Sequence, residues 1–282
     1  MGIGDILDRT FRLYRSHFMP YFLIMLVVQA FAFLTSLAWR VSFLSQVRTP
    51  HAGPGAGWSL AVTLGSLAFW IIVIVLNQIG IATLTAAVSS AFLQQEVSVR
   101  QSYLAVRDKL GRLLGVALLT SLLIGLGFML CVIPGVYWML SYMLVSEVVV
   151  LENLRPTAAM RRSKELMRVK TDKGFLRNNI TKASVILLIT VGLGIIVGGV
   201  VTVPFAIAQA TSRHARLAVY SPMSPLSILQ GVLTTVVQAA VAPVGRIAMV
   251  LFYYDVRIRK EGFDLQVLAS ALSGRTSPPG TP

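Results

Sequence analysis

Charged residues are scarce in this sequence. Only 13% of its 282 residues are charged, whereas 55% are hydrophobic and the mean hydropathy is +0.74. An ordinary globular domain carries about 25% charged residues, so this composition excludes a soluble protein. Acidic residues are rarer than basic ones: the sequence has 11 acidic and 25 basic residues, and its formal net charge is +14. An excess of basic residues is typical of proteins that bind nucleic acid or an anionic membrane surface. The long apolar runs favour the membrane, so we expect no nucleic acid partner.

Cysteine and histidine are also rare. The single Cys131 lies inside an apolar run, which excludes an intramolecular disulfide and a cysteine-based metal site. The three histidines, His17, His51 and His214, are far apart in the sequence, whereas a metal-dependent phosphodiesterase needs Glu, Asp and His gathered around its cation. The sequence therefore predicts no catalytic residues, no metal and no cofactor.

Six apolar runs are long enough to cross a membrane as helices, which takes about 20 residues each. We predict spans near residues 20–40, 59–84, 112–132, 135–151, 183–208 and 227–254. The third and fourth are joined by a tight turn at Val132–Gly135, where Pro134 and Gly135 end one helix and start the next. The predicted fold class is all-α, a polytopic membrane helix bundle that forms one domain over residues 1–272, followed by a disordered tail over 273–282.

Basic residues are unevenly distributed between the predicted loops. Twenty of the 25 fall in the N-terminus, in 93–112, in 152–182 and in the C-terminus, whereas the opposite loops hold only four. Short basic loops stay on the cytoplasmic side of a membrane, so we predict that both termini are cytoplasmic. Acidic and basic residues mix at the N-terminus, which does not fit a signal peptide, and we expect the first apolar run to remain as an anchor.

The second apolar run is too long for a single perpendicular crossing. Trp58 to Leu93 would measure about 54 Å as a helix, against a hydrocarbon core of about 30 Å. We predict a long tilted helix with a kink at 77–80, whose last part, Ala86 to Leu93, lies along the inner surface. A re-entrant loop is the alternative, but no proline interrupts the run.

A basic, half-apolar segment precedes each outward-going span. These segments are Ile3 to Phe18, Val97 to Leu110 and Ala158 to Arg177, and the first has apolar residues at helical spacing. They predict three units, each an interfacial amphipathic helix followed by a helical hairpin. The alternative is that the bias toward basic inner loops alone produces the pattern.

Two stretches resemble a bacterial family. They are VIPGVYWMLSYMLVSEVVVLENLRPTAAMRRSKELMR at 132–168 and LFYYDVRIRKEGFDLQ at 251–266, and the opening IGDILDRTFRLYRSHF is similar as well. The family is named for the glycerophosphoryl diester phosphodiesterase membrane domain. The resemblance covers the membrane region only, without the catalytic domain, and it implies a location in the bacterial inner membrane.

Two charged residues fall inside predicted spans, where an ionisable group is expensive to bury and therefore a functional candidate. Glu147 lies near the inner boundary, and Arg246 lies deeper, after Pro243 and Gly245. Because Glu147 is the only acidic residue in a predicted span, we predict an intramembrane pair of Glu147 and Arg246. Snorkelling of Glu147 to the interface is the alternative.

Two cytoplasmic stretches are candidates for contacts with anionic lipid headgroups or a protein partner. Clustered basic residues attract anionic headgroups, although topology anchoring alone would also explain them. The predicted contacts are Arg155, Arg161, Arg162, Lys164, Arg168, Tyr254, Asp255, Arg257, Arg259 and Lys260. In the second stretch, Phe252 to Tyr254 reads as an inner aromatic belt, and Gly262 is predicted to end the helix.

These features predict a non-catalytic integral membrane protein. The first hypothesis is an accessory or scaffold protein whose basic cytoplasmic face binds anionic lipid or a membrane or cytoplasmic partner protein. The alternative is a transporter or lipid-translocating protein, for which broken helices and midplane charges are typical. Pro204 and Pro243 are predicted to break the last two spans. A cavity that reaches Arg246 would favour the alternative.

Overall fold

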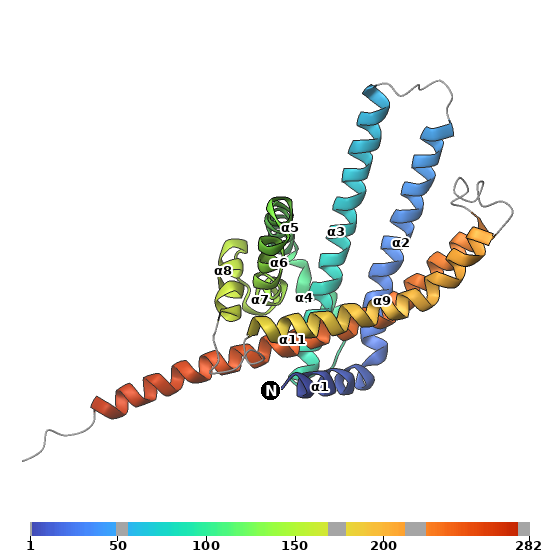
Figure 1. Ribbon diagram of the computed structural model, residues 1–282. Helices are drawn as coiled ribbons and strands as arrows, with labels where there is room; N and C mark the ends of the chain where they lie inside the picture. Colours follow the sequence, from blue (N-terminus) through green and yellow to red (C-terminus); the bar gives the residue numbers. More distant parts are fainter. Residues whose placement is uncertain (1, 49–55, 169–178, 212–223, 276–282) are drawn as a thin grey trace, which may run out of the picture.

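The computed structural model describes residues 2–48, 56–168, 179–211 and 224–275, and every regular element in these ranges is an α-helix. Figure 1 shows their order. The helices are α1 (Ile3–Ser16), α2 (Phe18–Arg48), α3 (Ala56–Phe92), α4 (Val99–Arg107), α5 (Leu110–Leu130), α6 (Val132–Ser141), α7 (Val145–Glu152), α8 (Pro156–Met167), α9 (Asn179–Thr211) and α11 (Pro225–Arg275).

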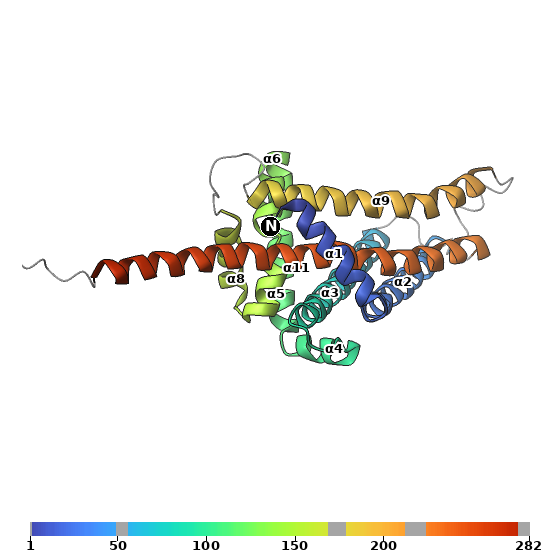
Figure 2. The ribbon, with the colours of Figure 1, turned by 90° about the horizontal axis from the view of Figure 1, so that it is seen from below.

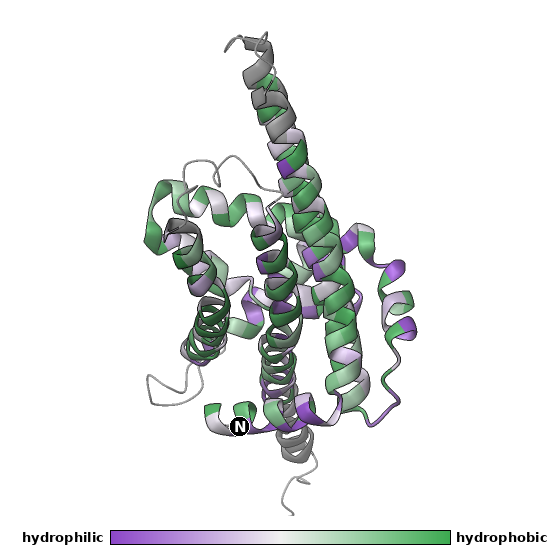
Figure 3. Ribbon diagram, turned by 90° about the vertical axis from the view of Figure 1, so that its right-hand side faces the viewer, coloured by the Kyte–Doolittle hydropathy of each residue, from purple (hydrophilic) through white to green (hydrophobic). Residues whose placement is uncertain are grey.

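Six segments within these helices are long and apolar enough to cross a membrane. They are Phe18–Ser42, Val62–Phe92, Leu110–Leu130, Val132–Glu152, Asn179–Ala208 and Pro225–Lys260. Many of their exposed residues are large and apolar, among them Trp70, Met129 and Ile195, and these helices are mostly green, the colour of hydrophobic residues, in Figure 3. The chain is therefore an all-α, multi-pass integral membrane protein, as the sequence predicted.

The core is centred on α11, which packs against α1, α2, α3, α8 and α9. Its segment from Ile247 to Phe252 is fully or almost fully buried, whereas hardly any residue in the most apolar window of α9 is buried. Seen from below, α9 and α11 run side by side, and α1 lies across them (Figure 2). The α2–α3 hairpin and the α9–α11 hairpin extend in different directions from this shared base (Figure 1).

The second span is one continuous helix, as predicted, since α3 runs from Ala56 to Phe92 without a break. Its last part packs inside the protein, since Ala87, Val88 and Ala91 are buried in the core. These small side chains allow close helix packing, which explains why this end of α3 enters the bundle. The predicted course of Ala86 to Leu93 along the inner surface stays a prediction.

Three short helices, α1, α4 and α8, stand before the three hairpins, and they confirm the predicted amphipathic elements as helices. Each buries one side against the protein, including Ile6 on α1, Val106 on α4 and Leu166 on α8, while most of its charged residues are exposed. The hydroxyl group of Tyr14 on α1 donates a hydrogen bond of 2.7 Å to the Ala240 carbonyl of α11. The first amphipathic helix is thus fastened to the central helix. The end of the third predicted segment, 169–177, lies outside the described residues.

Three predicted helix boundaries are wrong. Pro204 and Pro243 lie within the continuous helices α9 and α11, where neighbouring helices can compensate for the lost backbone hydrogen bond. Gly262 does not end the last helix, because α11 continues to Arg275. The predicted tail at 273–282 therefore begins inside α11, and its remaining residues, 276–282, lie outside the described residues.

The predicted fourth span is broken at a position that the sequence analysis did not identify. Residues 142–144 form a turn between α6 and α7. The Ser141 carbonyl at this break accepts a hydrogen bond of 2.9 Å from the Ser163 hydroxyl group of α8. A polar backbone group freed at membrane depth needs such a partner, so α8 stabilises the break.

Candidate functional site: a polar cavity beside Arg246

A cavity of about 420 Å³ lies between α3, α5, α6, α7, α9 and α11. Its lining contains seven polar side chains, although all of the lining residues belong to membrane-spanning segments. These residues are Gln78, Thr120, Ser121, Tyr142, Ser146, Thr190 and Arg246. Arg246 is the one charged residue of the lining. The cavity therefore combines one cation with neutral hydrogen-bonding groups.

The turn between α6 and α7 positions two of these groups. The amide of Val145 donates to the Tyr142 carbonyl over 3.2 Å, which closes the turn and starts α7 in a new direction. Tyr142 and Ser146 line the cavity from either side of this turn. The Ser146 hydroxyl group lies 3.5 Å from the Gln78 side-chain oxygen of α3, so the broken span contacts α3 at the cavity.

Glu147, the next residue, is completely buried in the first turn of α7. Neither of its carboxylate oxygens has a hydrogen-bond partner within the described part of the chain. The buried negative charge of Glu147 is instead compensated by its electrostatic attraction to the positive charge of Arg246 on α11. The positive end of the α7 helix dipole also favours a carboxylate in this first turn.

The predicted pair of Glu147 and Arg246 is thus brought together as charges, but not as a hydrogen-bonded bridge. The two residues differ in surroundings. Glu147 has no exposed surface, whereas Arg246 is partly exposed and lines the cavity. A guanidinium that faces a cavity and lacks a hydrogen-bonded carboxylate can bind an anion there.

A second polar cluster, which the sequence analysis missed, joins α7, α8 and α11 below the cavity. Glu152 accepts a hydrogen bond of 2.7 Å from the Tyr253 hydroxyl group and forms a salt bridge of 3.2 Å with Arg162. Arg257 donates to the same Tyr253 oxygen over 3.2 Å. No sequence spacing links Glu152 to Tyr253, 101 residues away, so only the folded structure reveals this cluster.

The basic amino end of α5 fixes the other end of α7. The Lys109 ammonium group donates to the Val150 carbonyl, and Arg112 donates to the Asn153 carbonyl over 3.0 Å. Asn153 ends α7 in the left-handed conformation, with φ of 56°. Cations at a helix C-terminus satisfy its free carbonyls and its dipole. Burial and the neighbouring Arg112 lower the pKa of Lys109.

The predicted headgroup or partner contacts fall into two groups. Arg155 precedes α8, Arg161 lies on it and Arg168 follows it, and all three are exposed, whereas Lys164 is partly buried. Arg161 lies 3.7 Å from Glu165, and Arg168 contacts Tyr137. The other members are less exposed and contact neighbouring elements. Arg162 pairs with Glu152, Arg259 with the buried Asp255 at 3.0 Å, and Lys260 with Glu165 at 3.9 Å, while Arg257 contacts Tyr253.

The predicted aromatic belt on α11 is wrong, because α11 is the central helix of the bundle. Phe252 and Tyr253 are fully buried. Tyr254 stacks on Phe92 of α3 with ring centroids 4.7 Å apart, and its hydroxyl group lies 2.8 Å from the Ser89 hydroxyl oxygen. These rings hold α11 against its neighbours.

Comparisons with family models, curated proteins and solved structures found no match to this chain. The family resemblance therefore stays a prediction. Within the described ranges, no three His, Cys, Asp or Glu side chains gather where they could hold a metal ion.

Proposed function

We propose that this protein binds an anionic group in the Arg246 cavity and moves it through the membrane, as a transporter or lipid-translocating protein. The observation that supports this proposal is the position of Arg246, which is the one charged residue of a polar cavity inside a membrane-spanning bundle. Ionisable groups at such depth usually mark a pathway for an ion or a substrate.

The lining indicates the chemistry of the ligand. A single guanidinium favours a phosphate or carboxylate, which it can bind through two parallel hydrogen bonds. Gln78, Ser146 and Thr190 add neutral polar groups, and no acidic side chain lines the cavity. The anion could belong to a lipid headgroup or to a small soluble molecule, since both present the same chemistry to Arg246.

Glu147 acts in this proposal as the resident counter-charge. Its carboxylate lies behind the cavity wall and compensates Arg246 when no ligand is bound. An incoming anion competes for the same guanidinium. In many transporters, a broken helix and charged groups meet at the substrate-binding site. The same features lie together here, since the break between α6 and α7 adjoins Glu147.

We place the protein in the bacterial inner membrane with both termini in the cytoplasm, acting without catalysis and without a cofactor. The basic loops support the orientation. The resemblance to the glycerophosphoryl diester phosphodiesterase membrane domain family supports the bacterial location.

Native mass spectrometry of the protein extracted gently from its own membranes tests the proposal. Wild-type protein should retain an anionic lipid or a small anion, and Arg246→Gln should lose it. Arg107→Gln is the matched control, since Arg107 is exposed on α4 and belongs neither to the cavity lining nor to the predicted headgroup contacts. Equal retention by all three proteins would contradict the proposal.

The accessory role is the second candidate function. The observation that favours it is the exposed trio Arg155, Arg161 and Arg168, on and next to α8, which would bind anionic headgroups or an acidic partner. A stoichiometric protein partner in the same spectra, lost when all three are replaced by glutamine, would place this function first. Retention of that partner by the triple variant would contradict it.

A further inference from the structure

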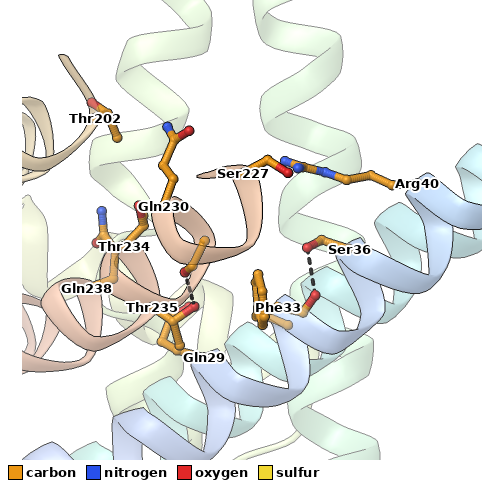
Figure 4. A pocket seen from close by; sticks show the side chains of 12 residues that line it. Gln29, Phe33, Ser36, Arg40, Thr202, Ser227, Gln230, Thr234, Thr235 and Gln238 are labelled. Carbon is orange, nitrogen blue, oxygen red and sulfur yellow. Dashed lines mark hydrogen bonds between the residues drawn. The ribbon is translucent and has the colours of Figure 1, made fainter. Parts of the chain in front are cut away.

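A second cavity, of about 330 Å³, lies between α2, α9 and α11. Nine of its twelve lining residues are polar, and none is acidic. They include Gln29 and Arg40 on α2, Thr202 on α9, and Gln230 and Gln238 on α11. In Figure 4, the Arg40 side chain extends from α2 toward Ser227 at one end of the cavity, and Gln238 lies toward the other.

The half of α11 that lines this cavity has its polar side facing inward. Ser227, Gln230, Thr234 and Gln238 recur at helical spacing on the cavity side. The residues between them are apolar and exposed, among them Leu229, Val232, Leu233 and Val236. This arrangement is the reverse of a soluble helix. In a membrane span, polar side chains turned away from the lipid hydrogen-bond to neighbouring helices or line a polar cavity, and these four line a cavity.

The same face of α11 continues into the Arg246 cavity. After Gln238, the next cavity-lining positions are Val241 and Ala242, followed by Gly245, Arg246 and Met249, all of which line the first cavity. From Ser227 to Met249 this face measures about 33 Å along the helix, close to the hydrocarbon thickness of about 30 Å. One apolar turn, Val241–Ala242, separates the two polar sections.

We infer that the cavity between α2, α9 and α11 is a second binding site for the same ligand, and that the ligand is an anionic molecule rich in hydroxyl groups. This inference rests on the proposed function. Arg40 binds the anionic group at one end, while the side-chain amides of Gln29, Gln230 and Gln238 both donate and accept hydrogen bonds and therefore suit hydroxyl groups. The ligand passes between the two sites along α11, and Val241–Ala242 is the barrier between them.

Thiol labelling tests this site directly. Cys131 is first replaced (Cys131→Ser), so that Gln230→Cys places one thiol in the cavity and Val236→Cys places one on the apolar face of the same helix. A negatively charged, water-soluble thiol reagent should modify position 230 at least ten times faster than position 236. Equal rates would overturn the inference, because they would mean that the cavity is no more accessible to water than the apolar face of the same helix.

Ligand protection identifies the source of the anion. Vesicles containing phosphatidylglycerol, which is anionic and bears hydroxyl groups, should slow labelling at position 230 at least fivefold relative to phosphatidylethanolamine vesicles. Glycerol phosphate added to the phosphatidylethanolamine vesicles tests whether the anion belongs to a small soluble molecule instead of a lipid. Protection by either probe supports the inference, and it should disappear with Arg40→Gln but persist with Thr35→Val, a neighbour on α2 outside the cavity lining. Absence of protection by both probes would overturn it.

The outcome is separable from that of the proposed function. If Arg246→Gln abolishes retention of the anion while position 230 is never protected, the second site is wrong and the proposed function stands. If position 230 is protected but Arg246→Gln changes nothing, the proposed function is wrong and the second cavity is an independent site.

Discussion

Neutralising Arg246 should destabilise the protein more than neutralising Glu147, because the two charges have different surroundings. Arg246→Gln leaves a fully buried carboxylate with no hydrogen-bond partner and no opposite charge. Removing one member of a buried pair costs about 3–5 kcal/mol, and we expect about 3 kcal/mol here because the pair has no direct hydrogen bond. Glu147→Gln leaves Arg246 facing a cavity where water can solvate it, so we expect a cost of about 1 kcal/mol.

The double variant should cost about as much as Glu147→Gln alone, which gives a coupling free energy of about 2–3 kcal/mol between the two positions. Equilibrium unfolding in mixed micelles of a mild detergent and dodecyl sulfate measures all four proteins. The control cycle uses Arg161 and Glu165, an exposed pair at 3.7 Å on α8, for which we expect less than about 0.5 kcal/mol. Additive effects at Glu147 and Arg246 would refute the argument.

Three further predictions concern stability. Glu152→Ala should lower the free energy of unfolding by about 2–3 kcal/mol, since it removes the carboxylate that pairs with the partly buried Arg162. A decrease below about 0.5 kcal/mol in the same unfolding assay would contradict this prediction. Burial raises the pKa of Tyr103 to about 12, so the folded protein holds its phenol proton after the unfolded chain has released it. Tyr103 should therefore lower the free energy of unfolding by about 1–2 kcal/mol, allowing for partial exposure, as the pH rises from 10.0 to about 12, and Tyr103→Phe should remove this part of the total fall, to which other buried tyrosines also contribute. Gly231→Ala should cost about 1–3 kcal/mol, because its Cβ would overlap the Phe33 ring. Phe33→Leu should restore part of the loss, and the overlap argument fails if it restores none.

The helical segments could be predicted from sequence because each follows from a local property. Long apolar runs must form helices in lipid, where every backbone group needs a partner within its own segment. The amphipathic spacing in 3–18 likewise identified α1. These signals lie within about 20 residues of the chain and need no knowledge of how the helices pack.

The break in the fourth span could not be predicted because its cause lies elsewhere in the chain. Residues 142–144 contain no proline or glycine, and the hydroxyl group that satisfies the Ser141 carbonyl comes from Ser163 on α8. Conversely, Pro204 and Pro243 suggested breaks but lie within continuous helices. Helix continuity at membrane depth depends on neighbouring helices as well as on local sequence.

The candidate site was only partly accessible from sequence. Glu147 and Arg246 could be selected because charges inside apolar runs are rare. The cavity beside Arg246 could not be predicted, because its polar side chains come from separate helices and each is a single polar residue in an apolar stretch of sequence. The central position of α11 was also hidden, so Tyr253 and Tyr254 were interpreted as membrane anchors when they are core residues.

Transport in proteoliposomes tests the central claim most directly. Vesicles with fluorescent phosphatidylglycerol in both leaflets, or loaded with radiolabelled glycerol phosphate, are reconstituted with wild-type protein, Arg246→Gln or the control Arg107→Gln, and movement across the membrane is followed over time. We expect wild type and Arg107→Gln to move one of the two probes at equal rates and Arg246→Gln to move it at least tenfold more slowly. Wild-type rates no higher than those of protein-free vesicles, or an Arg246→Gln rate equal to wild type, would contradict the account.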